Sequence, residues 1–446
     1  MLYFTYFSNI ILYLKCFSML ERKKEMTKNS YICNFINENP YDWQEKLSKY
    51  PYFLKIKEED GLYIFNYNLL AFEILEEATE EKEAVIARTN FTLPIVQEAR
   101  GIIINPESKE VVCWPFRKFG NFGESYVDNI DWKSASVQTK VDGSIMKVWF
   151  DKRPDKQKWR VSTNSMIEAH VAQNGFTNFG ELFDQAAFGE LDYSRLNIDN
   201  TYIFELVSPK TKVVIEYPET KIYHLGTRSN ITGQEYDLDI GIEKPGRFHL
   251  DSLSDCIKAA EELNKKCDEE NRFDVEFEGF VVCDKNFNRI KVKSPEYLMC
   301  HHALNNGVLS KRRTLELVES NEIEEYLTYF PQYKEELYNF QSKYFKVIDN
   351  INKYLKYSNN LFLKINKDKK EFAKIIVKDQ YSTFAFENLK YNKTAEDFFN
   401  GLFSSKKLEL IESVDSFENK NPSFTQLEEE ILQLIIGNKK ANDFNR

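Results

Sequence analysis

The sequence predicts an α+β protein made of antiparallel sheets with flanking helices, followed by an all-helical C-terminal domain. Two features predict this class. Between about residues 60 and 300, short runs of β-branched and aromatic residues follow one another across turns, without regular crossover helices. After about residue 297, apolar residues recur at helical spacing. The 446 residues allow two or three domains, and we expect an extension over 1–25, a sheet-containing domain over 26–296 and a helical domain over 297–446.

The individual elements follow from local patterns. The runs that predict strands are 61–70, 100–116, 159–165, 201–209, 211–217, 221–228, 277–283 and 288–294. Between them, 165–176 and 252–270 predict helices, the second with a good amphipathic period. In the C-terminal part, Leu337, Tyr344, Ile348 and Leu355 share one helical face. The segment 424–437 predicts a further helix that ends before Gly437.

Charge, cysteine content and the N-terminus limit the class of protein. The formal net charge is −10, so any site for a polyanion must be a local basic patch. The seven cysteines are scattered and form no CxxC pair, which favours reduced thiols in a cytoplasmic location and argues against a zinc cluster.

The apolar first 20 residues are interrupted by Lys15. We interpret them as an extension ahead of a start at Met19 or Met26 rather than a membrane anchor, and expect no membrane partner.

The stretch TKVDGSIMKVWF, residues 139–150, contains the first candidate for chemistry. Strand-like runs flank Asp142-Gly143, and this dipeptide predicts a hairpin between them. Lys140 stands just ahead of the turn. A lysine becomes a nucleophile only when it is deprotonated, which burial or neighbouring cations promote. A reactive Lys140 therefore requires further positive charge from elsewhere in the chain.

The segments RIKVKS and VEFEGFVV supply charges of both signs. Lys291 and Lys293 are two residues apart on a predicted strand, so they share a face that would grip a polyphosphate. Glu278 is followed by Gly279, which allows close approach of another group, and Glu205 interrupts an apolar run. Carboxylates near a triphosphate are what Mg²⁺ requires. The alternative is structural: lysines on a solvated edge strand and carboxylates in ordinary salt bridges.

Arg100 and Lys118 are further candidates for phosphate or base contacts, with ordinary surface cations as the alternative. There is no GxxxxGK[ST] motif, so a P-loop does not hold the phosphates. The absence of GxSxG leaves serine hydrolase chemistry unsupported. His301 and His302 are expected to be structural or to face RNA rather than to bind metal.

The order of these motifs resembles the covalent nucleotidyltransferase superfamily of ATP-dependent ligases and capping enzymes, and within it the RNA ligase 1 family of T-even bacteriophages. The segments that resemble this family are, in order, YIFNYN, EARGIII, RKFGNFGE, TKVDGS, YIFELVSPKTKVVI, EGFVV and IKVKSPEYLMCHH. They cover about residues 60 to 302. The helical C-terminal part resembles the family in position and character more than in residues.

The resemblance implies an ATP-dependent RNA ligase. Lys140 would attack the α-phosphate of ATP, release pyrophosphate and form a lysyl-AMP, and the AMP would pass to an RNA 5′-phosphate that a 3′-hydroxyl then attacks. It also implies roles for further residues at matching motif positions. Tyr67, Arg100 and Lys118 would contact the nucleotide, Lys291 and Lys293 its phosphates, and Glu205 and Glu278 the ribose or the Mg²⁺ shell.

Two positions depart from the family pattern. Thr163 stands where a second cation is expected, which puts one phosphate or RNA contact in doubt. The acidic metal ligands of the helical domain have an approximate counterpart in Glu324 and Glu325, for which a solvated helix face is the preferred interpretation.

The expected partner is RNA. DNA ligases and capping enzymes need an OB-fold after the last lysine motif, whereas this chain is predicted to be helical there. Lysines interleaved with Tyr344, Phe345, Tyr354 and Tyr357 between residues 343 and 378 suit docking of structured RNA; a basic helical hairpin with core aromatics is the alternative. The resemblance suggests tRNA cut in its anticodon loop as the substrate. The sequence shows no kinase or phosphatase module that would prepare RNA ends, so we expect a separate end-healing kinase or phosphatase. A non-catalytic RNA-binding protein with a ligase fold remains a second hypothesis.

Overall fold

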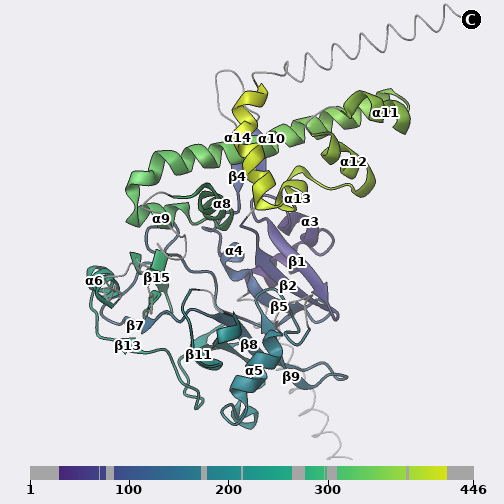
Figure 1. Ribbon diagram of the computed structural model, residues 1–446. Coiled ribbons are helices and arrows are strands. Elements are labelled where there is room, and N and C mark those ends of the chain that lie inside the picture. Colours follow the sequence, from purple (N-terminus) through teal and green to yellow (C-terminus); the bar gives the residue numbers. More distant parts are fainter. Residues whose placement is uncertain are drawn as a thin grey trace, which may run out of the picture. The chain divides into compact units, whose positions relative to one another are not determined.

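The computed structural model describes residues 30–69, 71–76, 85–171, 178–211, 214–263, 277–295, 297–298, 309–377 and 381–418 (Figure 1). The chain divides into two compact units, Met1–Ala303 and Leu304–Arg446. The predictions for residues 1–25, for His301 and His302 and for the helix over 424–437 lie outside the described residues. Antiparallel sheets in the first unit and helices in the second confirm the predicted α+β class.

The first unit contains a four-stranded antiparallel sheet, here called the first sheet. Its strand order is β1 (Leu54–Glu59), β2 (Leu62–Tyr67), β5 (Arg100–Asn105) and β6 (Glu110–Cys113). Alternating side chains bury both of its faces. One face, including Phe65 and Ile102, packs against α2 (Tyr31–Glu38), α3 (Trp43–Leu47) and α4 (Pro94–Glu98). The opposite face, including Ile64 and Ile103, packs against Trp149 of the next sheet. A separate ribbon pairs β3 (Phe72–Glu76) with β4 (Val85–Arg88).

Two further antiparallel sheets complete the first unit. The second sheet has the order β12 (Glu235–Tyr236), β11 (Lys221–Ser229), β10 (Asn200–Val207), β8 (Ser144–Asp151) and β9 (Lys158–Thr163), and α5 (Phe179–Ala187) covers it. The third sheet has the order β13 (Arg247–Phe248), β7 (Ser136–Thr139), β14 (Gly279–Cys283) and β15 (Arg289–Lys293), and it packs against α6 (Leu253–Leu263).

The predicted hairpin at Asp142-Gly143 is wrong. β7 pairs with β13 and β14 in the third sheet, whereas β8 pairs with β10 and β9 in the second sheet. Residues 140–143 therefore carry the chain from one sheet to another. The local dipeptide indicated a turn correctly, but the strand partners come from residues far away in the sequence.

Two other local predictions are also wrong where the structure describes them. Residues 165–171 form no helix, because Ala169 N–H donates to the Val161 carbonyl and holds this segment against β9. Of the predicted strand over 211–217, residues 214–217 form no strand: 214 and 215 lie in a bend, and 216 and 217 are irregular. There the Asp142 carboxylate accepts the backbone N–H groups of Val214 and Ile215, each at 2.9 Å, so these donors are not available to a strand partner.

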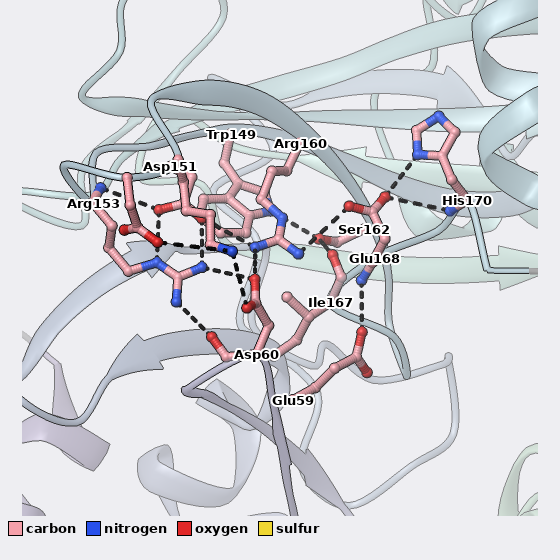
Figure 2. Close-up of polar contacts among 12 residues, drawn as sticks. Glu59, Asp60, Trp149, Asp151, Arg153, Arg160, Ser162, Ile167, Glu168 and His170 are labelled. Carbon is pink, nitrogen blue, oxygen red and sulfur yellow. Dashed lines mark hydrogen bonds and ion pairs between the residues drawn. The ribbon is translucent and has the colours of Figure 1, made fainter.

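A network of ion pairs joins the first and second sheets (Figure 2). Asp60, in the turn between β1 and β2, pairs with Arg160 of β9 at 2.8 Å and with Arg153 at 3.0 Å. Both arginines also pair with Asp151 at the end of β8, at 3.0 and 2.7 Å. Arg160 lies over the ring of Trp149 and is 5% exposed. The network therefore fixes the β1–β2 turn to the second sheet through a largely buried guanidinium.

The described part of the second unit is helical. Its helices are α8 (Lys311–Ser320), α9 (Ile323–Tyr329), α10 (Lys334–Lys364), α11 (Lys369–Ile376), α12 (Ser382–Tyr391), α13 (Ala395–Asn400) and α14 (Ser404–Glu418). Leu337, Tyr344, Ile348 and Leu355 are buried along α10, which confirms the predicted helical face. None of the helices described in this protein is both long and apolar enough to cross a membrane.

Candidate active site

Lys140 lies at the end of β7, where the chain leaves the third sheet. Its backbone N–H donates to the Gly279 carbonyl at 2.8 Å, which continues the pairing of β7 with β14 by one residue. Its ammonium group pairs with Glu278 Oε1 at 2.7 Å. The Lys140 side chain is 22% exposed and the Glu278 side chain 3%. The lysine is thus held by a buried carboxylate, yet a ligand can still reach it.

Gly279 permits the close packing that aligns this pair. Its φ is +148°, and an added Cβ would lie 2.1 Å from the Val292 carbonyl oxygen on β15. Any side chain here would push β14 and β15 apart. The prediction that this glycine allows another group to approach closely is therefore confirmed, and the group is the backbone beside Lys293.

Asp142 fixes the segment that crosses between the two sheets. Besides binding the backbone of 214 and 215, its carboxylate accepts a hydrogen bond from the Tyr297 hydroxyl at 3.0 Å. The adjacent Gly143 lies against β10, where an added Cβ would be 2.4 Å from the Leu206 carbonyl oxygen. The Asp-Gly pair therefore serves as an anchor rather than as a hairpin turn.

Two buried carboxyl groups lie beside Lys140. Glu278 immediately precedes β14, and Glu205 on β10 pairs in register with Ile145 of β8. Burial raises the pKa of Glu205 to about 8, with Lys140 opposing and Glu278 adding to the effect. Burial also raises the pKa of Glu278, although Lys140 and Lys293 lower it. Glu278 Oε2 is buried and accepts no hydrogen bond within the described residues.

The buried Glu278 Oε2 is a candidate ligand for the divalent metal that the resemblance implies. Mg²⁺ takes few protein oxygens and completes its shell with water and phosphate. Glu278 Oε2 and the nearby Glu205 fit such an ion. The described residues contain no group of three or more acidic, histidine or cysteine side chains arranged to hold a metal.

Several cations from different segments of the chain lie near Lys140 and Glu278. Arg100 of β5 lies 5.3 Å from the Phe119 ring centre, and Lys291 of β15 lies 5.2 Å from the same ring. Burial and the neighbouring Lys118, Arg100 and Lys293 lower the pKa of Lys291 well below its usual range. Burial is the largest cause of this lowering, and the neighbouring positive charges add to it, as expected where several cations lie close together. Lys293 is 8% exposed and contributes to the field at Glu278.

Tyr67 and Lys118 meet in an aromatic cage. The Lys118 ammonium lies 5.1 Å from the Tyr67 ring centre, 4.8 Å from that of Phe91 and 5.3 Å from that of Tyr126. Such contacts stabilise a largely buried cation. Tyr67 therefore holds Lys118, and this part of its role could not be predicted from residues 63–68 because the other two rings come from later segments.

A pocket opens beside these groups. The residues that line it come from all three sheets and include Arg100, Phe119, Lys140, Glu205, Val281 and Lys291. Lysine, glutamate and arginine thus meet at a single cavity, although they are up to about 190 residues apart in the chain.

The two departures from the family pattern have local structural roles or positions of their own. Thr163 Oγ1 accepts the backbone N–H of Met166 at 3.1 Å and closes the turn after β9. Glu324 is exposed, as expected for a solvated helix face, whereas Glu325 is 1% exposed, so that interpretation is wrong for Glu325.

Sequence reasoning missed Lys147 and Arg289. Lys147 on β8 is completely buried and contacts the carbonyl of Gly101, next to Arg100. Arg289 on β15 lies 4.1 Å from the Phe116 ring centre and pairs with Glu235 at 2.7 Å along the pocket wall. For Lys147 a signal was available: it shares a strand face with Ile145 and Trp149, and a charge in such a run is as unusual as Glu205 in β10.

Comparison with known proteins agrees with this geometry. Residues 98–297 match the model of a family described as RNA ligase. Over 264 residues the chain is 28% identical to a protein of Autographa californica nuclear polyhedrosis virus named as a bifunctional polynucleotide kinase/RNA ligase, covering 54% of this chain and 36% of that one. It is 29% identical to RNA ligase 1 of bacteriophage TS2126, covering 35% and 40%. These findings confirm the resemblance to the RNA ligase 1 family.

The chain spans roughly a third to two thirds of the length of the relatives it matches. Among solved structures, an archaeal ATP-dependent RNA ligase aligns with a TM-score of 0.32 and 13% identity, covering 51% of this chain and 63% of that one.

Proposed function

We propose that this chain, whose residues 98–297 match the RNA ligase family, is an ATP-dependent RNA ligase that joins 3′-hydroxyl and 5′-phosphate ends. The observation that carries the proposal is the pairing of Lys140 with Glu278 at the edge of a pocket lined by the cations Arg100 and Lys291, with Lys118 as a further positive neighbour of Lys291. A nucleophilic amine, a buried carboxylate and a polyanion site are the three parts that lysyl-AMP formation needs.

In the first step Lys140 attacks the α-phosphorus of ATP. The N–P bond forms as the bond to the bridging oxygen of the β-phosphate breaks, and pyrophosphate leaves. Before attack the ammonium must lose a proton, and Glu278 Oε1, 2.7 Å from the Lys140 Nζ, is the group within reach to accept it. Arg100, Lys291 and Lys293 neutralise the charge on the phosphates. A Mg²⁺ ion held by Glu278 and Glu205 would add further charge neutralisation when bound.

In the later steps the AMP moves to RNA. The RNA 5′-phosphate attacks the lysyl-AMP phosphorus and releases Lys140, and the 3′-hydroxyl of the second end then displaces AMP to form the phosphodiester. Both steps are displacements at phosphorus within the same positive pocket, so the same residues serve them by positioning and charge.

The second unit is proposed to dock the RNA, with broken tRNA as the substrate. Tyr344, Phe345, Tyr354 and Tyr357 are at most 6% exposed, so they form the unit's core and cannot act as stacking platforms. Lysines do remain on its surface. Those exposed near the α10–α11 turn are Lys356, Lys364, Lys367, Lys369, Lys370 and Lys374. Docking would therefore depend on phosphate contacts, which read shape and charge rather than bases.

The proposed chemistry also indicates a partner enzyme, and the cysteines indicate a cellular compartment. Ends that carry other phosphate groups must first be converted, so a separate kinase or phosphatase is expected, and one relative bears a polynucleotide kinase in its name. The four described cysteines are free thiols, which suits the reducing cytoplasm.

Two alternatives are disfavoured by specific features. A DNA ligase or capping enzyme would need an OB-fold after the last lysine motif, whereas the described residues between 309 and 418 form helices and no strand. A non-catalytic RNA-binding protein has no need for a lysine paired to a buried carboxylate at a cationic pocket.

The test is incubation with Mg²⁺ and ATP labelled at its α-phosphate. We expect a labelled protein band that is absent from Lys140→Met and unchanged in Lys152→Met, which alters an exposed lysine paired with Asp199. Adding RNA with a 5′-phosphate and a 3′-hydroxyl should discharge the label and yield joined RNA. A wild-type protein that never becomes labelled would instead support the RNA-binding alternative.

A further inference from the structure

The side chain of Lys147 is a charge in an apolar setting. It is 0% exposed on β8, with Trp149 two residues later in the core between the first and second sheets. Burial chiefly lowers its pKa, to about 8, and the nearby Arg100 lowers it further. No ion pair of the described residues includes Lys147. A buried lysine without a carboxylate partner is unfavourable for stability, so its position calls for an explanation.

The hydrogen bond that Lys147 makes points to such an explanation. Lys147 Nζ donates to the Gly101 carbonyl oxygen at 2.5 Å. Gly101 is the extra residue of a β-bulge: Phe65 of β2 pairs with Ile102 and Asn66 pairs with Arg100, which leaves Gly101 between them. Its φ is +79°. Bulges with a glycine in this conformation bend a strand and re-aim the adjacent side chain.

The re-aimed side chain is that of Arg100, which lines the pocket beside Lys140 and Lys291. An added Cβ on Gly101 would lie 2.6 Å from Lys147 Nζ and 2.8 Å from the Asn164 carbonyl oxygen. The bulge is thus enclosed by the second sheet, and the lysine is its hydrogen-bonding support there. Removing the donor would leave the Gly101 carbonyl buried without this partner.

We propose that Lys147 is a positioning residue that holds the Gly101 bulge and thereby aims the Arg100 guanidinium at the phosphates of the nucleotide. The inference rests on the proposed function, because Arg100 acts on the nucleotide of that reaction. Lys147 touches neither the nucleotide nor the reacting atoms. Lys147 acts on the nucleotide site through its hydrogen bond to the Gly101 carbonyl and through the adjacent Arg100.

The experiment is a double-mutant cycle on the full chain, with the initial rate of protein labelling measured at ATP concentrations below saturation. Lys147→Met keeps the length and removes the donor, and we expect about a tenfold loss. Arg100→Ala should cost more, about a hundredfold. If Lys147 acts through Arg100, the double variant should be within about twofold of Arg100→Ala alone.

Controls separate positioning from stability. Lys152→Met, which changes an exposed lysine one residue beyond the same strand, should label like wild type. Thermal unfolding identifies which variants are folded. If Lys147→Met does not fold, Lys147→Gln takes its place in the cycle, because its amide donor ends one bond short of the lysine Nζ and weakens the hydrogen bond to the Gly101 carbonyl. Multiplicative losses in the double variant, or no loss in the single variant, would overturn the inference while a labelled wild type left the proposed function standing. An unlabelled wild type would overturn both.

Discussion

Glu205 is a carboxyl group of the pocket whose ionisation depends strongly on its surroundings. Burial raises its pKa to about 8, whereas a carboxyl in the unfolded chain has a pKa near 4.5. Between these values the unfolded chain releases the proton and the folded chain retains it. The contribution of Glu205 to stability is therefore lost progressively as pH rises from about 4.5 to about 8.

We predict that Glu205→Gln raises the melting temperature by several degrees at pH 8 and changes it little at pH 4.5, because about 1.4 kcal/mol accompanies each pKa unit. Labelling by ATP should fall in the same variant. The measurement is thermal unfolding across this pH range. Glu190→Gln, which changes an exposed carboxyl, is the control and should leave the pH dependence as in wild type.

Gly279 provides a second prediction for a single residue. Gly279→Ala should destabilise the first unit by about 3 kcal/mol or more and prevent labelling, because the added Cβ would overlap the Val292 carbonyl oxygen. Gly189→Ala is the matched control: its φ is +79° and nothing lies within 4 Å of an added Cβ. It should cost about 1 kcal/mol. Urea unfolding measures both, and equal losses would mean that backbone conformation rather than steric overlap governs Gly279.

The site residues that the sequence identified are those that belong to short motifs with a strand spacing. Lys140, Glu278, Lys291 and Lys293 could be selected because each belongs to a short motif whose strand geometry fixes which side chains share a face. Lys147 is visible in the sequence as a charge in an apolar strand run, but its role is not, since the carbonyl that it contacts belongs to a residue 46 positions away in the chain. The cage around Lys118 likewise combines rings from residues 67, 91 and 126.

At the level of elements, the link between the first and second sheets depends on Arg160. Arg160→Met should lower the free energy of unfolding by about 3 kcal/mol, because it leaves the buried Asp151 with fewer partners. Lys49→Met, which removes an exposed pair with Glu45, should change it by less than about 1 kcal/mol. Denaturant unfolding distinguishes the two. If Arg160→Met cost no more than Lys49→Met, the network in Figure 2 would not be what holds the sheets together.

Most strands were predictable as elements, whereas their partners were not. The runs that became β10, β11, β14 and β15 are rich in β-branched and aromatic residues, so local preference and final structure agree. The hairpin at Asp142-Gly143 failed because pairing with β14 and β10 outweighs the local turn preference. Residues 214–217 do not form a strand because the Asp142 side chain binds their backbone, which a local pattern does not reveal.

At the level of the whole molecule, the chain has two compact units, so the proposal that the second unit docks RNA can be tested separately from the chemistry proposed for the first. Changing Lys367, Lys370 and Lys374 together to glutamine should weaken RNA binding. The slope of log affinity against log salt should fall by about 0.7–0.9 for each phosphate that the variant no longer neutralises. Protein labelling by ATP should be unaffected.

The control for this prediction neutralises three exposed lysines of the first unit, Lys46, Lys49 and Lys57. It matches the charge change and should alter the salt slope less. Filter binding at several salt concentrations measures the slope. Equal slopes for the two triple variants would show that net charge, rather than the surface near the α10–α11 turn, governs binding.

The crossing of residues 140–143 from one sheet to another has a mechanical consequence. Because Lys140 is anchored to β14 on one side and Asp142-Gly143 to β10 and its neighbours on the other, the spacing between the two sheets sets the reach of the amine. A change that moved the second and third sheets apart would therefore move the Lys140 amine away from the α-phosphate without contacting Lys140. A change that held the two sheets closer together would restrict the position of the amine.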